Sequence, residues 1–372
     1  MITGIRKSGK STILKQYIDF INNTEKANII IFDYNDLTTK YTYNNIVVLD
    51  KYIKTKLSKT KTNYIFFDEI QELDNFQILI NSLSLNPLND IYITGSNAKL
   101  LSSEISTLLT GKNIKISVYP LSFKEIYENA NIHSLTKEDL FINYMQIGGM
   151  PGVLDYENKT TEAKQYLNMV FSDILEHDIF NRHTISDVQI FKNIFYYLQE
   201  NIGGNIVVDN IRKYLLSNYK IKITNQSISN YITWLVDSFL VYRISKKEIK
   251  GKEILANSSK IYSIDLGIRN ATINQFSNRG RMLENIVFIE LCRRGYEVYV
   301  GKDKYINEID FICIKQNEIM YIQVTEAISK TNYEREIKQL EKINDSNKKI
   351  VLSLDKIQDK TESGIYCLNL ID

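Results

Sequence analysis

The first dozen residues constrain the fold most, because two glycines separated by four residues are followed there by Lys and Ser. This spacing, in Gly4, Gly9, Lys10, Ser11 and Thr12, is typical of a loop that binds phosphate. The glycines allow backbone N–H groups to curl around the β- and γ-phosphates of a nucleotide, and Lys10 adds a positive charge there. The Ser11 hydroxyl is suited to ligate Mg²⁺. The pattern therefore predicts a site for ATP and Mg²⁺ near the start of the chain.

The residues around this loop match the strand–loop–helix context that such a motif needs. Apolar residues between Ile13 and Ile21 recur at helical spacing, and the positive end of that helix would face the anion. The strand before the loop contains only residues 1–3. We therefore expect either a half-length strand or a chain shortened at its N-terminus, without an adenine-contacting segment ahead of the loop.

Short apolar runs alternate with helical patterns throughout residues 1–125. The runs are continuous, as expected of strands covered on both faces, and occupy residues 29–32, 64–67, 91–93 and 114–119. Such alternation predicts βαβ crossovers and a parallel sheet.

Polar residues follow two of these runs. Asp68, at the carboxyl end of its strand, would hold Mg²⁺, and Glu69 would act as the general base that activates water. The alternative is a solvated acidic turn. Asn97, or its neighbour Ser96, would sense the γ-phosphate, although Gly-Ser-Asn is also an ordinary turn sequence. The predicted catalytic set is therefore Glu69, Lys10 and Asn97.

The middle of the chain changes to helical patterns. The sequence predicts helices over 187–200, 207–216 and 224–239, followed by strands at 240–244 and 260–264. The polar start of the third helix could face a DNA groove, and a Lys-rich turn completes the outline of a winged helix-turn-helix. DNA contact and a role as a lid or protein-docking module remain equally open.

Residues 280–372 are predicted to form another α/β unit. Helices are expected over 282–294 and 334–343, and strands over 296–300, 308–314, 319–324 and 350–354. Glu308 and Asp310 are two residues apart, so both side chains project from one face of a strand. With Glu284 they could form a site for a hard cation such as Mg²⁺. The alternative is a solvent-facing acidic pair on an edge strand.

Composition narrows the class of protein. The net charge is +2, so no overall field attracts nucleic acid or an anionic membrane. The three cysteines lie far apart, which favours reduced thiols and a cytoplasmic location. No apolar run reaches the roughly 18 residues of a membrane span.

Together these motifs resemble a family of bacterial and archaeal AAA-like ATPases whose C-terminal half is a domain of unknown function. The resemblance covers nearly the whole chain. The motifs that carry it are Gly4 to Thr12, Asp68-Glu69-Ile70-Gln71, Thr94-Gly95-Ser96-Asn97, Pro120-Leu121-Ser122-Phe123-Lys124-Glu125, Gly148-Gly149-Met150-Pro151, Lys260-Ile261-Tyr262-Ser263-Ile264-Asp265-Leu266-Gly267, Leu283-Glu284-Asn285, Glu308-Ile309-Asp310-Phe311 and Gln323-Val324-Thr325.

The resemblance implies a RecA/AAA-like P-loop sheet, a helical winged-helix middle region and a C-terminal α/β domain with a restriction-endonuclease-like fold. Family members often carry Ala-Gly-Arg where this chain has Thr110-Gly111-Lys112. Active nucleases of that fold carry an acid-x-Lys motif where this chain has Gln323-Val324-Thr325. Loss of both the carboxylate, at Gln323, and the lysine, at Thr325, argues against DNA cleavage. A lysine from an adjacent strand could replace the missing one: Lys302, Lys304 or Lys315.

The predicted domains are a P-loop ATPase domain over residues 1–125, a helical and winged-helix region over 126–265, and a nuclease-like α/β domain over 266–372. The chain would act as an ATP-driven switch, with DNA as a candidate partner and a homo-oligomer as a candidate assembly. One alternative is a module that binds ATP without hydrolysing it. The other alternative is an ATP-controlled nuclease that uses Glu284, Glu308 and Asp310. If the chain does not cut DNA, its nuclease site is vestigial and comprises Glu284, Glu308, Asp310 and Gln323.

Overall fold

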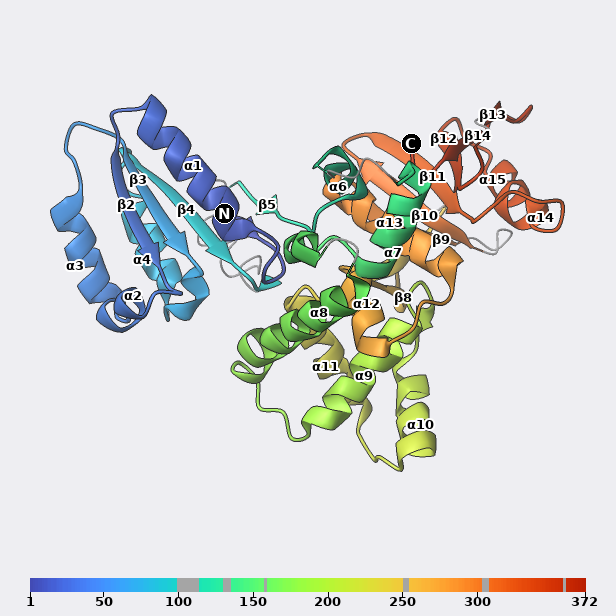
Figure 1. Ribbon diagram of the computed structural model, residues 1–372, viewed down its shortest axis with the longest axis horizontal. Coiled ribbons are helices and arrows are strands. Elements are labelled where there is room, and N and C mark those ends of the chain that lie inside the picture. Colours follow the sequence, from blue (N-terminus) through green and yellow to red (C-terminus); the bar gives the residue numbers. More distant parts are fainter. Residues whose placement is uncertain (99–113, 130–134, 157–158, 250–253, 303–307, 357–358) are drawn as a thin grey trace. The chain divides into compact units, whose positions relative to one another are not determined.

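The computed structural model describes residues 1–98, 114–129, 135–156, 159–249, 254–302, 308–356 and 359–372. These form two compact units, which we describe separately (Figure 1). The N-terminal unit comprises Met1–Pro120 and Asp237–Phe239, and the C-terminal unit comprises Leu121–Val236 and Leu240–Asp372.

The N-terminal unit is built on a five-stranded parallel sheet with the order β2-β3-β4-β1-β5. Its strands are β1 (Ile2–Thr3), β2 (Asn28–Asp33), β3 (Asn63–Asp68), β4 (Asn89–Gly95) and β5 (Ile116–Ser117). The prediction of a parallel α/β sheet is therefore confirmed. Since all the strands run the same way, their carboxyl ends meet at one edge of the sheet, where ligands bind in open α/β folds.

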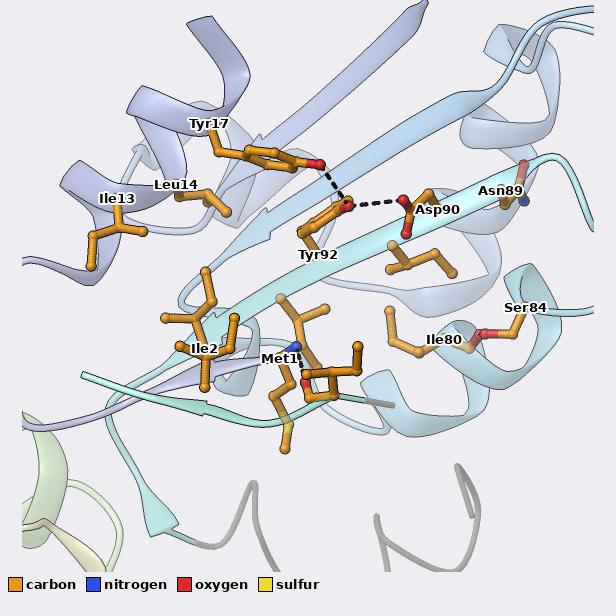
Figure 2. Close-up of a pocket in the computed structure, with 14 residues that line it drawn as sticks. Met1, Ile2, Ile13, Leu14, Tyr17, Ile80, Ser84, Asn89, Asp90 and Tyr92 are labelled. Carbon is orange, nitrogen blue, oxygen red and sulfur yellow. Dashed lines mark hydrogen bonds between the residues drawn. The ribbon is translucent and has the colours of Figure 1, made fainter. Parts of the chain in front are cut away.

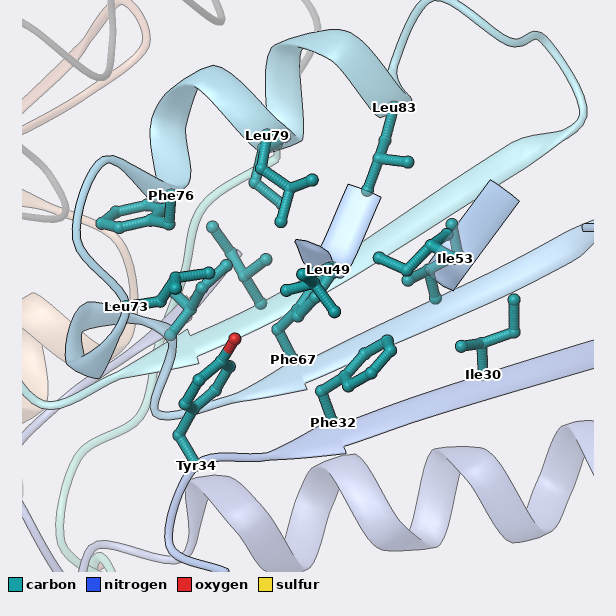
Figure 3. Close-up of a cluster of buried hydrophobic side chains, with 14 residues drawn as sticks. Ile30, Phe32, Tyr34, Leu49, Ile53, Phe67, Leu73, Phe76, Leu79 and Leu83 are labelled. Carbon is teal, nitrogen blue, oxygen red and sulfur yellow. The ribbon is translucent and has the colours of Figure 1, made fainter. Parts of the chain in front are cut away.

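Helices cover both faces of this sheet. They are α1 (Lys10–Thr24), α2 (Leu37–Thr42), α3 (Ile46–Lys56) and α4 (Phe76–Leu83). Every residue of β3 is buried, and its side chains alternate between two cores. Ile65 and Phe67 pack in the cluster formed with α3 and α4 (Figure 3), whereas Tyr64 and Phe66 pack against α1. This two-sided burial explains why the run is apolar throughout.

The C-terminal unit contains a nine-stranded mixed sheet with the order β13-β14-β12-β11-β10-β9-β7-β8-β6. Its strands are β6 (Asn205–Ile206), β7 (Val241–Glu248), β8 (Ile254–Ser263), β9 (Glu297–Lys302), β10 (Ile309–Lys315), β11 (Glu318–Val324), β12 (Lys348–Ser353), β13 (Asp359–Lys360) and β14 (Tyr366–Asn369). The predicted hairpin is present as the antiparallel pair β10–β11.

Helices complete the C-terminal unit. They are α6 (Phe123–Asn129), α7 (Lys137–Ile147), α8 (Thr160–Ile174), α9 (Val188–Glu200), α10 (Val208–Tyr219), α11 (Asn225–Asp237), α12 (Leu266–Ile273), α13 (Arg279–Arg293), α14 (Tyr333–Glu336) and α15 (Lys338–Glu341). The short helix α12 lies among α7, α8 and α9, with most of its residues buried. The helix predicted over 334–343 is divided into α14 and α15.

The predicted middle region shares its sheet with the C-terminal region. Helices α9, α10 and α11 match the predicted helices, and β7 and β8 match the strands that follow them. However, β7 also pairs in parallel with β9, so the expected boundary at residue 265 lies within one sheet-bearing unit. A winged-helix role in DNA binding and a nuclease-like fold stay predictions. In the described parts of the chain, no helix has the length and apolar character needed to span a membrane.

Candidate functional site

The loop between β1 and α1 depends on glycine at both of its ends. Gly9, which caps α1, has φ 99° and ψ 10°, a left-handed conformation that glycine adopts without cost. A Cβ added to Gly4 would lie 2.1 Å from the carbonyl oxygen of Val118, whereas one added to Gly9 would meet no atom within 4 Å. The loop therefore leaves open space beside the N-terminus of α1, where the helix favours an anion.

Lys10 is the first residue of α1, and its side chain folds back into the loop. Its Nζ donates hydrogen bonds to the carbonyl oxygens of Gly4 at 3.0 Å and Ile5 at 3.1 Å. The same Nζ lies 3.6 Å from Oε1 of Glu69, and the Lys10 residue is only 4% exposed. The structure thus brings the predicted loop lysine next to the predicted general base.

Asp68, at the carboxyl end of β3, contacts both neighbouring elements. Its Oδ1 accepts a hydrogen bond from Oγ1 of Thr94 on β4, and the Ser11 side chain on α1 also bonds to it. Burial raises the pKa of Asp68 above its ordinary value, and the hydrogen bonds from Thr94 and Ser11 offset only part of that effect. A cation here would favour the charged carboxylate. The two predicted Mg²⁺ ligands, Ser11 and Asp68, are therefore in contact.

Glu69 adopts a left-handed backbone conformation, with φ 54° and ψ 48°. This conformation is uncommon for a residue with a side chain and is often found at functional sites. The backbone N–H of Glu69 donates to Oγ1 of Thr94 at 2.9 Å, and its carboxylate accepts a hydrogen bond from Nε2 of Gln71. Glu69 is 6% exposed, so it does not lie in a solvated turn.

The end of β4 lies close to these groups. Ser96 and Asn97 are both buried, and Nε2 of Gln71 lies 3.5 Å from Oγ of Ser96. Gln71 therefore connects the carboxylate of Glu69 to the segment predicted to sense the γ-phosphate. Thr12 is exposed on the first turn of α1, and its contact with a nucleotide stays a prediction, as does the sensor role of Asn97.

Two further residues of this site, Thr94 and Gln71, were named from the sequence only as members of family motifs and were given no role. Thr94 contacts both Asp68 and Glu69, and Gln71 contacts both Glu69 and Ser96. A polar residue at the carboxyl end of an otherwise apolar strand was a usable signal for Thr94. No comparable signal marks Gln71, because it follows the strand in a short turn.

A cavity of about 550 Å³ in the same unit does not contain these groups (Figure 2). It lies against α1 and β4, and most of its lining is apolar. Three of its polar side chains bond to one another: the Tyr17 and Tyr92 hydroxyls are 3.1 Å apart, and Tyr92 donates to Oδ2 of Asp90 at 2.8 Å. Among the described residues that line this cavity, none has a cationic side chain that could bind a phosphate.

The four residues predicted as a vestigial nuclease site lie together in the C-terminal unit. Glu284, Glu308, Asp310 and Gln323 line one cavity of about 550 Å³. Strand β10 lies inside the sheet between β9 and β11, so the alternative of an acidic pair on an edge strand is wrong. Lys260 of β8 also lines the cavity. A role for this cluster in cleavage, or as a vestige of it, stays a prediction.

Two lysines neutralise the carboxylates of this cluster. Nζ of Lys260 lies 2.9 Å from Oε1 of Glu284 and 2.9 Å from Oε1 of Glu308. Nζ of Lys246 lies 2.6 Å from Oε2 of Glu308, and the Tyr262 hydroxyl donates to Oε1 of Glu284. Burial alone would lower the pKa of Lys260, but the surrounding carboxylates outweigh burial and raise it.

Lys260 is not one of the lysines that the sequence offered for this place. Lys315 donates to the carbonyl oxygen of Arg294 at 2.7 Å, and Lys302 is exposed. Lys304 and residues 110–112 lie outside the described residues. Within the described ranges, no group of three or more His, Cys, Asp or Glu side chains is arranged to hold a metal ion.

Comparison with known proteins gives a consistent division of the chain. Residues 1–127 match a family model described as an AAA domain, and residues 138–279 match a domain of unknown function (DUF8612). An uncharacterized protein of Haemophilus influenzae is 35% identical over 378 residues, which cover 100% of this chain and 93% of that protein. An uncharacterized protein of Methanocaldococcus jannaschii is 35% identical over 361 residues, which cover 92% of this chain and 78% of that protein.

Solved structures give more distant similarities. A Walker-type ATPase of Pyrococcus abyssi matches with a TM-score of 0.47 and 15% identity, covering 73% of this chain and 89% of that one. The ORC1 protein of Aeropyrum pernix, in complex with DNA, matches with a TM-score of 0.35 and 12% identity, covering 74% of this chain and 86% of that one.

The full-length relatives decide the family. Both are more than one-third identical to this chain over nearly all of it. Their similarity extends across the AAA domain and the domain of unknown function, in agreement with the motifs and with the parallel sheet. The chain therefore belongs to a family of bacterial and archaeal proteins that join an N-terminal AAA-like P-loop domain to a C-terminal domain of unknown function.

Proposed function

We propose that this protein binds MgATP and hydrolyses it at the carboxyl edge of the N-terminal sheet. The observation that carries the proposal is the convergence of Lys10, Ser11, Asp68 and Glu69, which come from α1 and from the end of β3. A lysine, a hydroxyl and two carboxylates are the groups that phosphoryl transfer to water requires. The nucleotide state would then switch the arrangement of the chain.

The loop is suited to the phosphates. The left-handed Gly9 opens the space in front of the helix N-terminus, where backbone N–H groups and the helix dipole favour negative charge. The ammonium of Lys10 is held by the carbonyl oxygens of Gly4 and Ile5, which are uncharged acceptors. Phosphate oxygens would form stronger, charge-assisted hydrogen bonds, so we expect Lys10 to turn toward them when nucleotide binds.

Ser11 and Asp68 fit a magnesium ion. Their side chains already contact each other, both offer oxygen, and burial of Asp68 makes a nearby cation favourable. When bound, Mg²⁺ would neutralise charge on the phosphate oxygens. Thr94 holds the Asp68 carboxylate in place through its hydroxyl.

Glu69 is positioned to take a proton from water. Its backbone is fixed by Thr94, and its carboxylate is held by Gln71 and lies close to Lys10. Movement of Lys10 toward a phosphate would free one side of the carboxylate, which could then orient and deprotonate an attacking water. This couples nucleotide binding to activation of the base.

The Glu69→Gln variant tests the proposal. We expect it to bind MgATP but to hydrolyse it at least about 100-fold more slowly, because Gln keeps the shape and cannot take the proton. Glu72→Gln is the control, since its carboxylate pairs with Lys40 at 2.7 Å instead. Steady-state phosphate release and calorimetric binding would be measured for both. ATP binding without turnover in the wild type would favour the alternative of a non-catalytic module.

The proposal also includes DNA as a partner and assembly into a homo-oligomer, and each is tested by its own experiment. Adding DNA to the hydrolysis assay tests whether DNA is a partner of α9–α11 or of the C-terminal sheet. An unchanged rate together with no measurable DNA binding would remove that partner. Sedimentation with and without MgATP tests the homo-oligomer.

A further inference from the structure

The cavity beside Lys260 in the C-terminal unit has features of a ligand site that ATP hydrolysis does not use. Its lining comes from β8, the N-terminal part of α13, the β10–β11 hairpin with the residues that flank it, α14 and α15. A volume of about 550 Å³ is ample for a nucleotide-sized group. The chemistry of its lining decides what kind of ligand it suits.

Three of the carboxylates that line this cavity are already partnered, and the fourth, that of Glu326, is exposed. Glu284 accepts hydrogen bonds from Lys260 and Tyr262, and Glu308 is paired with both Lys260 and Lys246. Oδ2 of Asp310 accepts the backbone N–H of Val324 at 2.9 Å. The ammonium of Lys260 occupies the space between Glu284 and Glu308, which a metal ion would otherwise fill. Glu284, Glu308 and Asp310 therefore do not form a free cation site.

The other polar groups that line the cavity include hydrogen-bond donors. Gln323 is only 4% exposed, and its Oε1 accepts the backbone N–H of Asp310 at 3.1 Å. Its Nε2 therefore faces the cavity, and no side chain or backbone group among the described residues accepts a hydrogen bond from it. This amide group is therefore available to donate a hydrogen bond to a ligand in the cavity.

The first turn of α13 supplies more donors to the same cavity. Asn278, which precedes the helix, has no side-chain capping bond, and the first turn contains no acidic residue. Among the described residues, none accepts the backbone N–H groups of Arg279, Gly280 or Arg281. A Cβ added to Gly280 would meet no atom within 4 Å, so this end of the helix is open to a ligand. Basic side chains here oppose the helix dipole, which an anion would relieve.

We propose that this cavity binds a phosphate group directly, without a metal ion, through Gln323, Arg281 and the N-terminal turn of α13. Lys260 and Lys246 offset the charge of Glu284 and Glu308, so these carboxylates do not repel the anion. The phosphate is either part of a nucleic-acid strand or carried by a small phosphorylated molecule. Both sources present the same oxygen acceptors to the same donors.

The test uses the full chain carrying Lys10→Ala, so that the N-terminal loop does not contribute, in a buffer with EDTA. The probes are fluorescein-labelled single-stranded DNA and RNA, read by anisotropy, and inorganic phosphate and AMP, read by calorimetry. We expect Arg281→Ala and Gln323→Leu each to weaken binding at least about tenfold, the scale of one hydrogen bond to a charged group. Arg294→Ala, at the other end of α13, is the matched control and should bind like the parent.

The outcomes of this test separate the two sources of phosphate. Oligonucleotide binding that phosphate displaces indicates a strand, and binding of phosphate or AMP alone indicates a small ligand. If Gln323→Leu unfolds on heating earlier than its parent, Gln323→Glu replaces it and should also bind more weakly. The proposal is overturned if no probe binds, if binding needs Mg²⁺, or if Arg294→Ala weakens binding as much as Arg281→Ala.

Discussion

The two units each bury a lysine next to carboxylates, and they do so for different ends. In the N-terminal unit, Lys10 is held by two uncharged carbonyl oxygens and lies 3.6 Å from one carboxylate. In the C-terminal unit, Lys260 lies 2.9 Å from each of two carboxylates. Exchangeable neutral acceptors leave a lysine ready for a phosphate, whereas close ion pairs fix it in place. We therefore propose different roles for the two side chains: ligand binding for Lys10 and structural ion pairing for Lys260.

The largest expected effect is the loss of stability on substitution of Lys260. Lys260→Met keeps the side-chain volume but leaves Glu284 and Glu308 with buried, less compensated charge. We expect the C-terminal unit to lose about 3–5 kcal/mol of unfolding free energy, the usual cost of removing one partner of a buried pair. The single Trp, Trp234, lies in α11, so its fluorescence during urea unfolding reports on this unit.

The control for Lys260→Met is Lys213→Met. Lys213 pairs with Asp209 on the surface, with 67% of its side chain exposed, so its loss should change stability by less than about 1 kcal/mol. If Lys260→Met proved no more destabilising than this control, the view of Lys260 as a structural ion-pair partner would be wrong.

A smaller effect, on ATP hydrolysis, should follow from Thr94→Val in the N-terminal site. Val fills the same space but cannot donate to Asp68 or accept the N–H of Glu69. We expect ATP hydrolysis to fall roughly tenfold, in line with about 1–3 kcal/mol for an unsatisfied buried group. Thr62→Val, at an exposed position, is the comparison variant. Equal rates for the two variants would show that Thr94 does not position the carboxylates.

The smallest expected effect concerns Asp265, a buried carboxyl group that is held by backbone N–H groups. Asp265 accepts the backbone N–H groups of Gly149 at 2.7 Å and Ile268 at 3.0 Å, yet burial raises its pKa to about 6. The folded state then holds a proton that the unfolded state releases, so stability falls as pH rises from about 4 to about 6.

Denaturation at pH 5 and pH 7.5 measures this titration. The loss of stability between these two pH values should be about 1–2 kcal/mol smaller in Asp265→Asn than in the wild type, because the variant has no carboxyl to titrate there. Identical pH dependence in both proteins would show that the Asp265 carboxyl stays ionised despite its burial.

Which residues come together in the N-terminal unit could be predicted from the sequence, because each is marked by a local pattern. The loop glycines, Lys10 and Ser11 are contiguous, and Asp68 and Glu69 follow an apolar run whose strand must end at the same sheet edge. A parallel sheet brings such strand ends together by geometry alone. Thr94 was within reach of the same reasoning.

The C-terminal cluster could be predicted only in part. Glu308 and Asp310 were grouped with Glu284 from their strand spacing, and Gln323 was added from the resemblance, but Lys260 was not placed with them. Its place depends on the pairing of β7 with β8 and β9, which joins the predicted middle region to the C-terminal sheet. Pairing between strands distant in sequence leaves no signal in local spacing, so the ion pairs of Lys260 emerge only from the fold.

Calorimetric titration of MgATP into the wild type, Lys10→Ala and Lys15→Ala tests the central claim most directly. Lys15 is an exposed lysine on the same helix and serves as the control for loss of charge. We predict that the wild type and Lys15→Ala bind MgATP alike, whereas Lys10→Ala binds at least about 100-fold more weakly with its fold intact, as expected for loss of charge-assisted hydrogen bonds. Wild-type affinity in Lys10→Ala, or no binding in the wild type, would contradict the assignment of the nucleotide site.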